Sequence, residues 1–129
     1  MSIVVGYIPT PEGEAALERA ISESAATKAP LVVVNSTRGD AIVDQRFVQS
    51  DAAEALDSRL AASGVEHILL QPMGGNDAAD EVLDAAEEHR ADLIVIGLRK
   101  RTPVGKLIMG STAQRILLQA ECPVLAVKA

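Results

Sequence analysis

Five short, nearly unbroken apolar runs are distributed along this 129-residue chain, and they constrain its fold more than any other feature. Runs rich in Val, Ile and Leu that do not alternate with polar residues are typical of strands covered on both faces, as in a parallel sheet. We therefore predict strands at residues 3–8, 31–34, 67–70, 93–96 and 124–127.

The segments between these runs show the spacing of amphipathic helices. Their apolar residues lie three or four positions apart, so that they share one face of a helix. These apolar residues are Leu17 and Ile21; Leu56 and Leu60; Ala79, Val82, Leu83 and Ala86; and Ala113, Ile116, Leu117 and Ala120. Strands that alternate with helices over short connections predict a single α/β domain over residues 1–129, an open parallel sheet with helices on both faces.

Acidic residues occupy the outer faces of the predicted helices, for example Glu14, Glu18, Asp80 and Asp84. Carboxylates at helical spacing more often form a solvated face than a binding surface. We therefore interpret these side chains as solubilising.

Two connections, residues 37–50 and 98–109, are longer than the others. Ser50 or Asp51 is expected to cap the helix that follows the first connection. Long loops at the carboxyl ends of strands are where open α/β sheets bind ligands. These two loops are therefore the candidate binding segments.

Composition argues against nucleic acid as a partner. Aromatic residues make up only 2% of the chain, so it has no stacking platform for single-stranded bases. The net charge of −6 also repels polyanions at long range. A small phosphate-bearing molecule is the better candidate, because a compact cationic segment can still hold it at short range.

The chain carries one cysteine, Cys122, and two histidines. These residues can form neither an internal disulfide nor a sequence-local zinc cage, so we expect no metal site. No apolar run approaches the roughly 20 residues that span a bilayer, and the first residues lack the basic start of a signal peptide. We therefore expect a cytoplasmic protein with no membrane partner.

A cationic island lies between residues 93 and 120, where five basic residues and no acidic one occur. They are Arg99, Lys100, Arg101, Lys106 and Arg115. Within this island Gly110 allows a backbone conformation and a close approach that a side chain would obstruct, and Ser111 or Thr112 stands where a helix N-cap is expected. In one interpretation, the amides at the helix start and the nearby cations form a phosphate site. In the other, an ordinary helix begins after a basic loop that only keeps the surface soluble. Local physics favours neither interpretation over the other.

The segment GLRKRTPVGKLIMGST, residues 97–112, resembles the nucleotide-binding pattern GxxGx9G[ST] of the universal stress protein family. The resemblance extends from IVVGY near the start to CPVLAVK near the end. It implies a Rossmann-like, adenine nucleotide alpha hydrolase-like fold with strand order 3-2-1-4-5. It also implies a homodimer often formed through the fifth strand and, in one subgroup, a bound ATP or AMP.

The same resemblance implies which residues surround the nucleotide. Those around the phosphates and ribose are Gly97, Arg99, Lys100, Gly110, Ser111 and Thr112, and those around the base are Ile8, Pro9, Thr10 and Ser36. Lys100 stands where the family pattern has its second glycine. Ile8 stands where many nucleotide-binding members have an aspartate.

These two departures leave two functions open. A hydrogen bond from Lys100 to a phosphate, worth about 1.5–3 kcal/mol, offsets the base contact that is lost at Ile8, but it does not restore base selectivity. The first function is therefore a stress-response regulatory protein with a phosphate-anchored nucleotide site of modest base discrimination. The alternative is a homodimeric interaction module whose degenerate site binds no nucleotide. An enzyme that hydrolyses ATP slowly ranks last, because the basic loop offers neither a general base nor magnesium ligands.

The last predicted strand, residues 124–127, is uncharged and lies at a sheet edge in the implied order. An unprotected apolar edge pairs readily with another chain. We therefore expect a two-fold homodimer formed through this strand.

Overall fold

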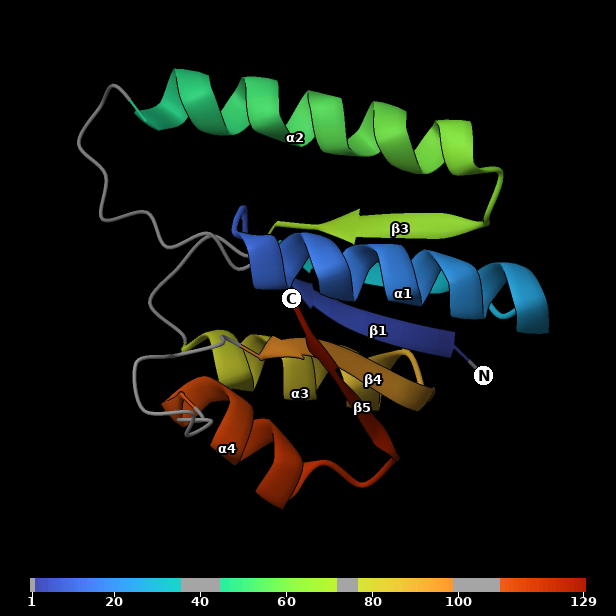
Figure 1. Cartoon of the computed structure of the whole chain (residues 1–129), viewed down its shortest axis with the longest axis vertical. Coiled ribbons are helices and arrows are strands. Elements are labelled where there is room, and N and C mark those ends of the chain that lie inside the picture. The colour runs from blue at the N-terminus through green and yellow to red at the C-terminus, as the bar shows by residue number, and fades with distance from the viewer. Residues whose placement is uncertain (1, 36–44, 72–76, 99–109) are drawn as a thin grey trace.

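The computed structural model describes residues 2–35, 45–71, 77–98 and 110–129, and it describes the side chains of the second range from residue 54 onward. Within these residues, strands and helices alternate along the chain (Figure 1). The elements are β1 (Ser2–Tyr7), α1 (Pro11–Thr27), β2 (Leu31–Asn35), α2 (Gln45–Ser63), β3 (His67–Leu70), α3 (Ala78–Glu88), β4 (Ala91–Leu98), α4 (Ser111–Gln119) and β5 (Val124–Lys128).

The strands form one parallel sheet in the order β3-β2-β1-β4-β5, which confirms the predicted topology. The central strand β1 pairs with β2 on one side and β4 on the other, so that Val5 lies opposite both Val33 and Val95. Val4 and Val5 are both fully buried although they face opposite sides of the sheet. Burial on both faces explains why the strand sequences are continuously apolar.

Helices cover both faces of the sheet. Leu17 of α1 and Leu60 of α2 belong to the core on one face, and Val82 of α3 and Ile116 of α4 belong to the core on the other. In Figure 1, α1 crosses in front of β1 and α3 lies behind β4. Each of these four side chains is at most 1% exposed, and burial of such a side chain contributes about 1.5–3 kcal/mol.

The helix starts agree only in part with the predicted caps. The Thr10 hydroxyl accepts a hydrogen bond from the Gly13 amide at 3.1 Å and caps α1. The predicted cap of α2 at Ser50 or Asp51 is wrong, because α2 begins at Gln45 and contains both residues. Residues 45–50 include no Gly or Pro, so the helix propagates through them once its later turns are packed.

Among the described residues, no helix combines sufficient length with sufficient apolar character to cross a bilayer.

Candidate functional site

The direction of the strand order switches between β1 and β4, and the candidate site lies at the carboxyl ends of these two strands. The two strands are neighbours, but the chain leaves β1 toward β2 and leaves β4 toward β5, on opposite faces of the sheet. In open α/β sheets such a switch in strand order is where ligands bind. Residues 8–10 follow β1, Gly97 lies near the end of β4, and α4 begins at Ser111, so the structure brings these predicted segments to one edge.

Gly97 is explained by packing inside the protein. A Cβ atom at this position would lie 2.1 Å from the carbonyl oxygen of Glu12 in the first turn of α1. The glycine therefore lets α1 approach β4, and it does so without any ligand.

The turn between β1 and α1 is equally tight. A Cβ atom at Gly13 would lie 1.9 Å from the carbonyl oxygen of Ile8, and the Thr10 amide donates to that same oxygen at 2.8 Å. Sequence reasoning missed Gly13, although a glycine in the first turn of a helix is a signal, because it lowers helix propensity. The turn leaves Pro9 exposed, Thr10 half-buried and the Ile8 side chain 36% exposed.

Gly110 differs from both of these glycines. Among the described residues nothing lies within 4 Å of the position that its Cβ would occupy. Its φ of −68° and ψ of 160° are open to any residue, so the expectation that it needs a special backbone conformation is wrong. Among the described residues, neither the backbone angles nor a close neighbour accounts for a glycine at this position.

Gly110 is also the N-cap of α4, and the predicted N-cap at Ser111 or Thr112 is wrong. The Gln114 amide donates to the Gly110 carbonyl at 3.0 Å, so Ser111 is already the first helical residue. A glycine has no side chain that could accept hydrogen bonds from the amides of residues 111–113, and these amides have no acceptor within the helix. The positive end of α4 therefore presents donors that suit an anion.

Part of the predicted site lies outside the described residues. Ser36, Arg99 and Lys100 belong to this part, and their roles stay predictions. Among the described residues, no group of three or more His, Cys, Asp or Glu side chains gathers where it could hold a metal ion.

Of the five cations in the island, Arg115 lies within the described residues, and it forms ion pairs with two carboxylates. One terminal nitrogen lies 2.7 Å from the Asp77 carboxylate, and the other donates to the Asp80 carboxylate. Asp80 is therefore not the purely solvated residue that helical spacing predicted. Long-range ion pairs of this kind join α3 to α4 and leave no signal in local sequence.

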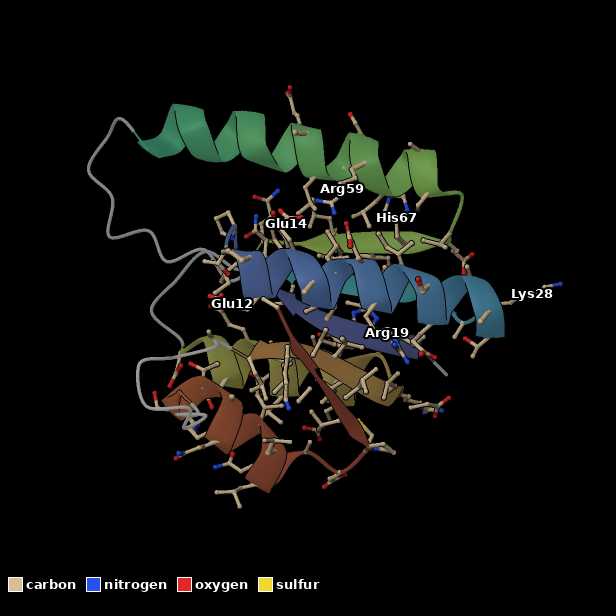
Figure 2. All side chains as sticks on the ribbon, in the orientation of Figure 1. Glu12, Glu14, Arg19, Lys28, Arg59 and His67 are labelled. Atoms are coloured by element: carbon tan, nitrogen blue, oxygen red, sulfur yellow. The ribbon has the colours of Figure 1, made fainter. Side chains whose placement is uncertain are left out.

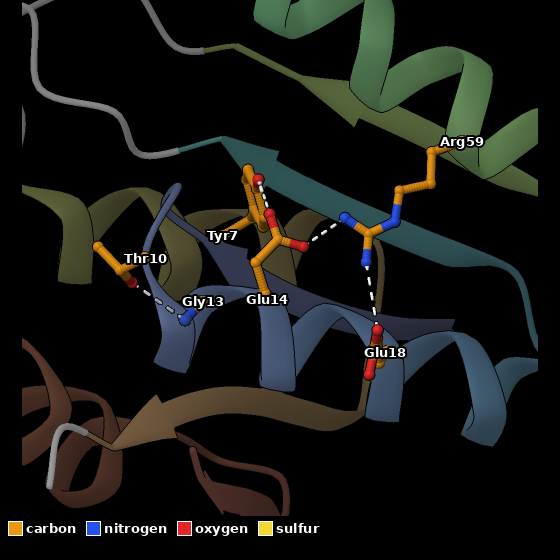
Figure 3. Close-up of polar contacts among 6 residues, drawn as sticks. All are labelled: Tyr7, Thr10, Gly13, Glu14, Glu18 and Arg59. Carbon is orange, nitrogen blue, oxygen red and sulfur yellow. Dashed lines mark hydrogen bonds and ion pairs between the residues drawn. The ribbon is translucent and has the colours of Figure 1, made fainter.

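Glu14 is also more than a solvated acid (Figure 3). It accepts a hydrogen bond from the Tyr7 hydroxyl at 2.5 Å and another from Arg59, which also lies 3.7 Å from Glu18. Figure 2 shows Glu14 and Arg59 directed toward each other between α1 and α2. Sequence reasoning missed this cluster because Arg59 lies 45 positions from Glu14.

The cluster shifts two pKa values in opposite directions. Burial and the bond to Glu14 raise the pKa of Tyr7 to about 12, because both oppose formation of the phenolate. Burial alone would raise the pKa of Glu14, but the hydrogen bonds from Tyr7 and Arg59 outweigh it and the pKa is lowered. At neutral pH the cluster therefore contains a neutral phenol, a carboxylate and a guanidinium that tie β1, α1 and α2 together.

Comparison with known proteins gives a consistent result over the full length of the chain. The model of the universal stress protein family matches residues 1–128. A universal stress protein of Mycolicibacterium smegmatis is 48% identical over 126 residues, covering 98% of this chain and 96% of the relative.

Two solved structures from Archaeoglobus fulgidus are similar in fold. A universal stress protein superimposes with a TM-score of 0.80 at 31% identity, and one in complex with dAMP with a TM-score of 0.75 at 26% identity. Each comparison covers 99% of this chain and 98% of the other. The expected adenine nucleotide alpha hydrolase-like fold is confirmed.

Proposed function

Because the chain belongs to the universal stress protein family, we propose that it is a cytoplasmic stress-response protein that binds an adenine nucleotide, ATP or AMP. The nucleotide would bind at the sheet edge formed by the carboxyl ends of β1 and β4, with its phosphates on the amides that begin α4. The relative in complex with dAMP supports an adenine nucleotide as the ligand.

Gly110 is the observation that carries this proposal. Unlike Gly97, it has no described neighbour that excludes a side chain and no backbone angle that requires glycine. A glycine that no described contact requires is explained if a phosphate approaches the helix start closely. Cations at Arg99 and Lys100, beside Gly97 in sequence, would add charge-assisted contacts.

The residues expected around the base support only weak discrimination between different bases. The exposed Ile8 side chain offers an apolar contact in place of a carboxylate, and the Thr10 hydroxyl oxygen is already used to cap α1. We therefore propose that affinity comes mainly from the phosphates. The exposed Ile8 is also the observation that favours the alternative, a dimeric module of the same family that binds no nucleotide.

The strand β5 supports a homodimer as the working assembly. It forms one edge of the sheet, and its residues Val124–Val127 are only half-buried in the single chain. Pairing of two such edges around a two-fold axis would cover them.

The substitution Gly110→Ser tests the phosphate site. A serine at the N-cap accepts a hydrogen bond from the first-turn amides, so it stabilises the helix by a few tenths of a kcal/mol. The same bond competes with the phosphate, and loss of one charge-assisted contact of about 1.5–3 kcal/mol weakens binding roughly ten- to a hundredfold. We expect calorimetry with ATP and AMP to show weaker binding while urea unfolding shows unchanged or higher stability.

Leu118→Ser is the matched control, because Leu118 is 84% exposed near the other end of the same helix. This variant should bind nucleotide like the wild type. Unchanged affinity in Gly110→Ser would show that the α4 amides do not hold the phosphates. A wild-type protein that binds neither ATP nor AMP at sub-millimolar concentration would favour the alternative function.

A further inference from the structure

Arg115 lies one turn into α4, and both of its terminal nitrogens are engaged with acids of α3. One contacts Asp77 and the other contacts Asp80. Asp77 is itself the N-cap of α3, where its side chain accepts a hydrogen bond from the Ala79 amide at 3.3 Å. The pairs therefore connect the start of α3 to the start of α4.

The acids that Arg115 holds lie close to the proposed phosphate site. Arg115 is four positions after Ser111, which corresponds to about 6 Å along the helix axis. Helical side chains lean toward the N-terminus of their helix, which brings the guanidinium closer to the first-turn amides. The axial distance is shorter than the Debye length of about 10 Å at 0.1 M salt, so charges at Arg115 are only partly screened from the start of α4.

A third carboxylate adds to the negative charge at this place. Glu81 is partly buried in the first turn of α3, and its amide donates to the Asp77 carbonyl. Burial and the nearby charge of Asp77 both raise the pKa of Glu81. The start of α3 is therefore an acidic cluster, Asp77, Asp80 and Glu81, which Arg115 partly neutralises.

We propose that Arg115 is a positioning residue for nucleotide binding: it neutralises Asp77 and Asp80 beside the α4 amides and does not itself bind the phosphates. This inference rests on the proposed nucleotide function. Without Arg115, the negative charge of Asp77 and Asp80 would be less compensated near the start of α4, and α4 would lose these two ion pairs with the start of α3. The competing role is that of a direct ligand, in which the guanidinium leaves the acids for a phosphate.

Charge-neutral variants of the acids separate the two roles. Arg115→Gln should weaken ATP binding about three- to tenfold, and AMP binding less, because ATP carries more charge. The effect should shrink in 1 M salt, where the Debye length is about 3 Å. Arg115→Gln combined with Asp77→Asn and Asp80→Asn should restore ATP affinity to within about twofold of the wild type. Asparagine is also a good N-cap, so α3 keeps its start.

Arg115→Lys is the conservative control, since its ammonium also neutralises the acids, and it should bind nearly like the wild type. Urea unfolding of every variant shows whether it is folded when affinity is measured. The inference is overturned if the triple variant binds ATP as weakly as Arg115→Gln, or if Arg115→Gln binds normally. If the wild type binds no nucleotide, the proposed function itself has failed, which is a different outcome from a missing rescue.

Discussion

The carbonyl oxygen of Glu12 lies 2.1 Å from the position that a Cβ atom on residue 97 would occupy. This relationship separates the two described glycines of the nucleotide-binding pattern. Gly97 is required by the contact between α1 and β4, whereas Gly110 has open space around it among the described residues. One pattern in the sequence therefore combines a requirement of the fold with a feature that we assign to the ligand.

Gly97→Ala is expected to destabilise the protein by about 3 kcal/mol, at the upper end of the cost of overpacking, because rigid backbone must move. Gly110→Ala meets no described neighbour, and only the weaker capping by alanine lowers its stability, by less than about 1 kcal/mol. Urea unfolding of both variants measures the difference. Equal losses would show that the α1–β4 contact does not require a glycine.

Ionisation of Tyr7 should be shifted in the folded protein. The pKa of Tyr7 is raised to about 12 by burial and by its bond to Glu14, so the protonated phenol stabilises the fold below pH 10 and this contribution is lost as the pH rises through 12. Tyr7 is the only tyrosine, so tyrosinate absorbance reports it alone. We expect a midpoint near 12 in the folded protein and near 10 in urea.

Glu14→Gln serves as the control for this titration, because it removes the carboxylate that raises the pKa while burial persists. The midpoint should fall but stay above 10. A folded wild-type protein that titrates at 10 would contradict the hydrogen bond between Tyr7 and Glu14.

Substitution in β5 tests the proposed homodimer. Leu125 packs partly against the core beneath α1, and Leu69 of the opposite edge strand β3 packs against the same core. Leu125→Lys and Leu69→Lys should therefore cost similar stability, whereas only Leu125→Lys should place a charge in the dimer contact. Sedimentation should give a monomer for Leu125→Lys and a dimer for Leu69→Lys. Dimers in both variants would remove β5 as the interface.

The strand positions illustrate what can be predicted from a sequence of this kind. The run at 67–70 is a strand with the predicted bounds, and the other strands differ from prediction only by a few residues at their ends. Burial on both faces selects apolar residues at every position, so the signal is local and strong. The predicted N-caps of α2 and α4 are wrong, because a side chain that is suited to capping does not by itself determine where a helix begins.

The candidate site was predicted less completely than the fold. Gly97, Gly110 and Ser111 were found through their spacing, and the sheet order places their segments at one edge. Arg115 belongs to the predicted cationic island, but in the structure it pairs with Asp77 and Asp80. Its partners lie 38 and 35 positions away, where no periodicity relates them.

The sequence alone thus determined the succession of strands and helices and the edge where a ligand would bind, since these depend on local burial patterns and on motif spacing. Only the tertiary structure decided which charges remain available. In the sequence, Glu14 and Arg115 do not differ from other surface charges. In the structure, Glu14 of α1 pairs with a residue of α2, and Arg115 of α4 pairs with residues at the start of α3. Ion pairs between distant segments depend on how helices pack, and helix packing is a property of the assembled core.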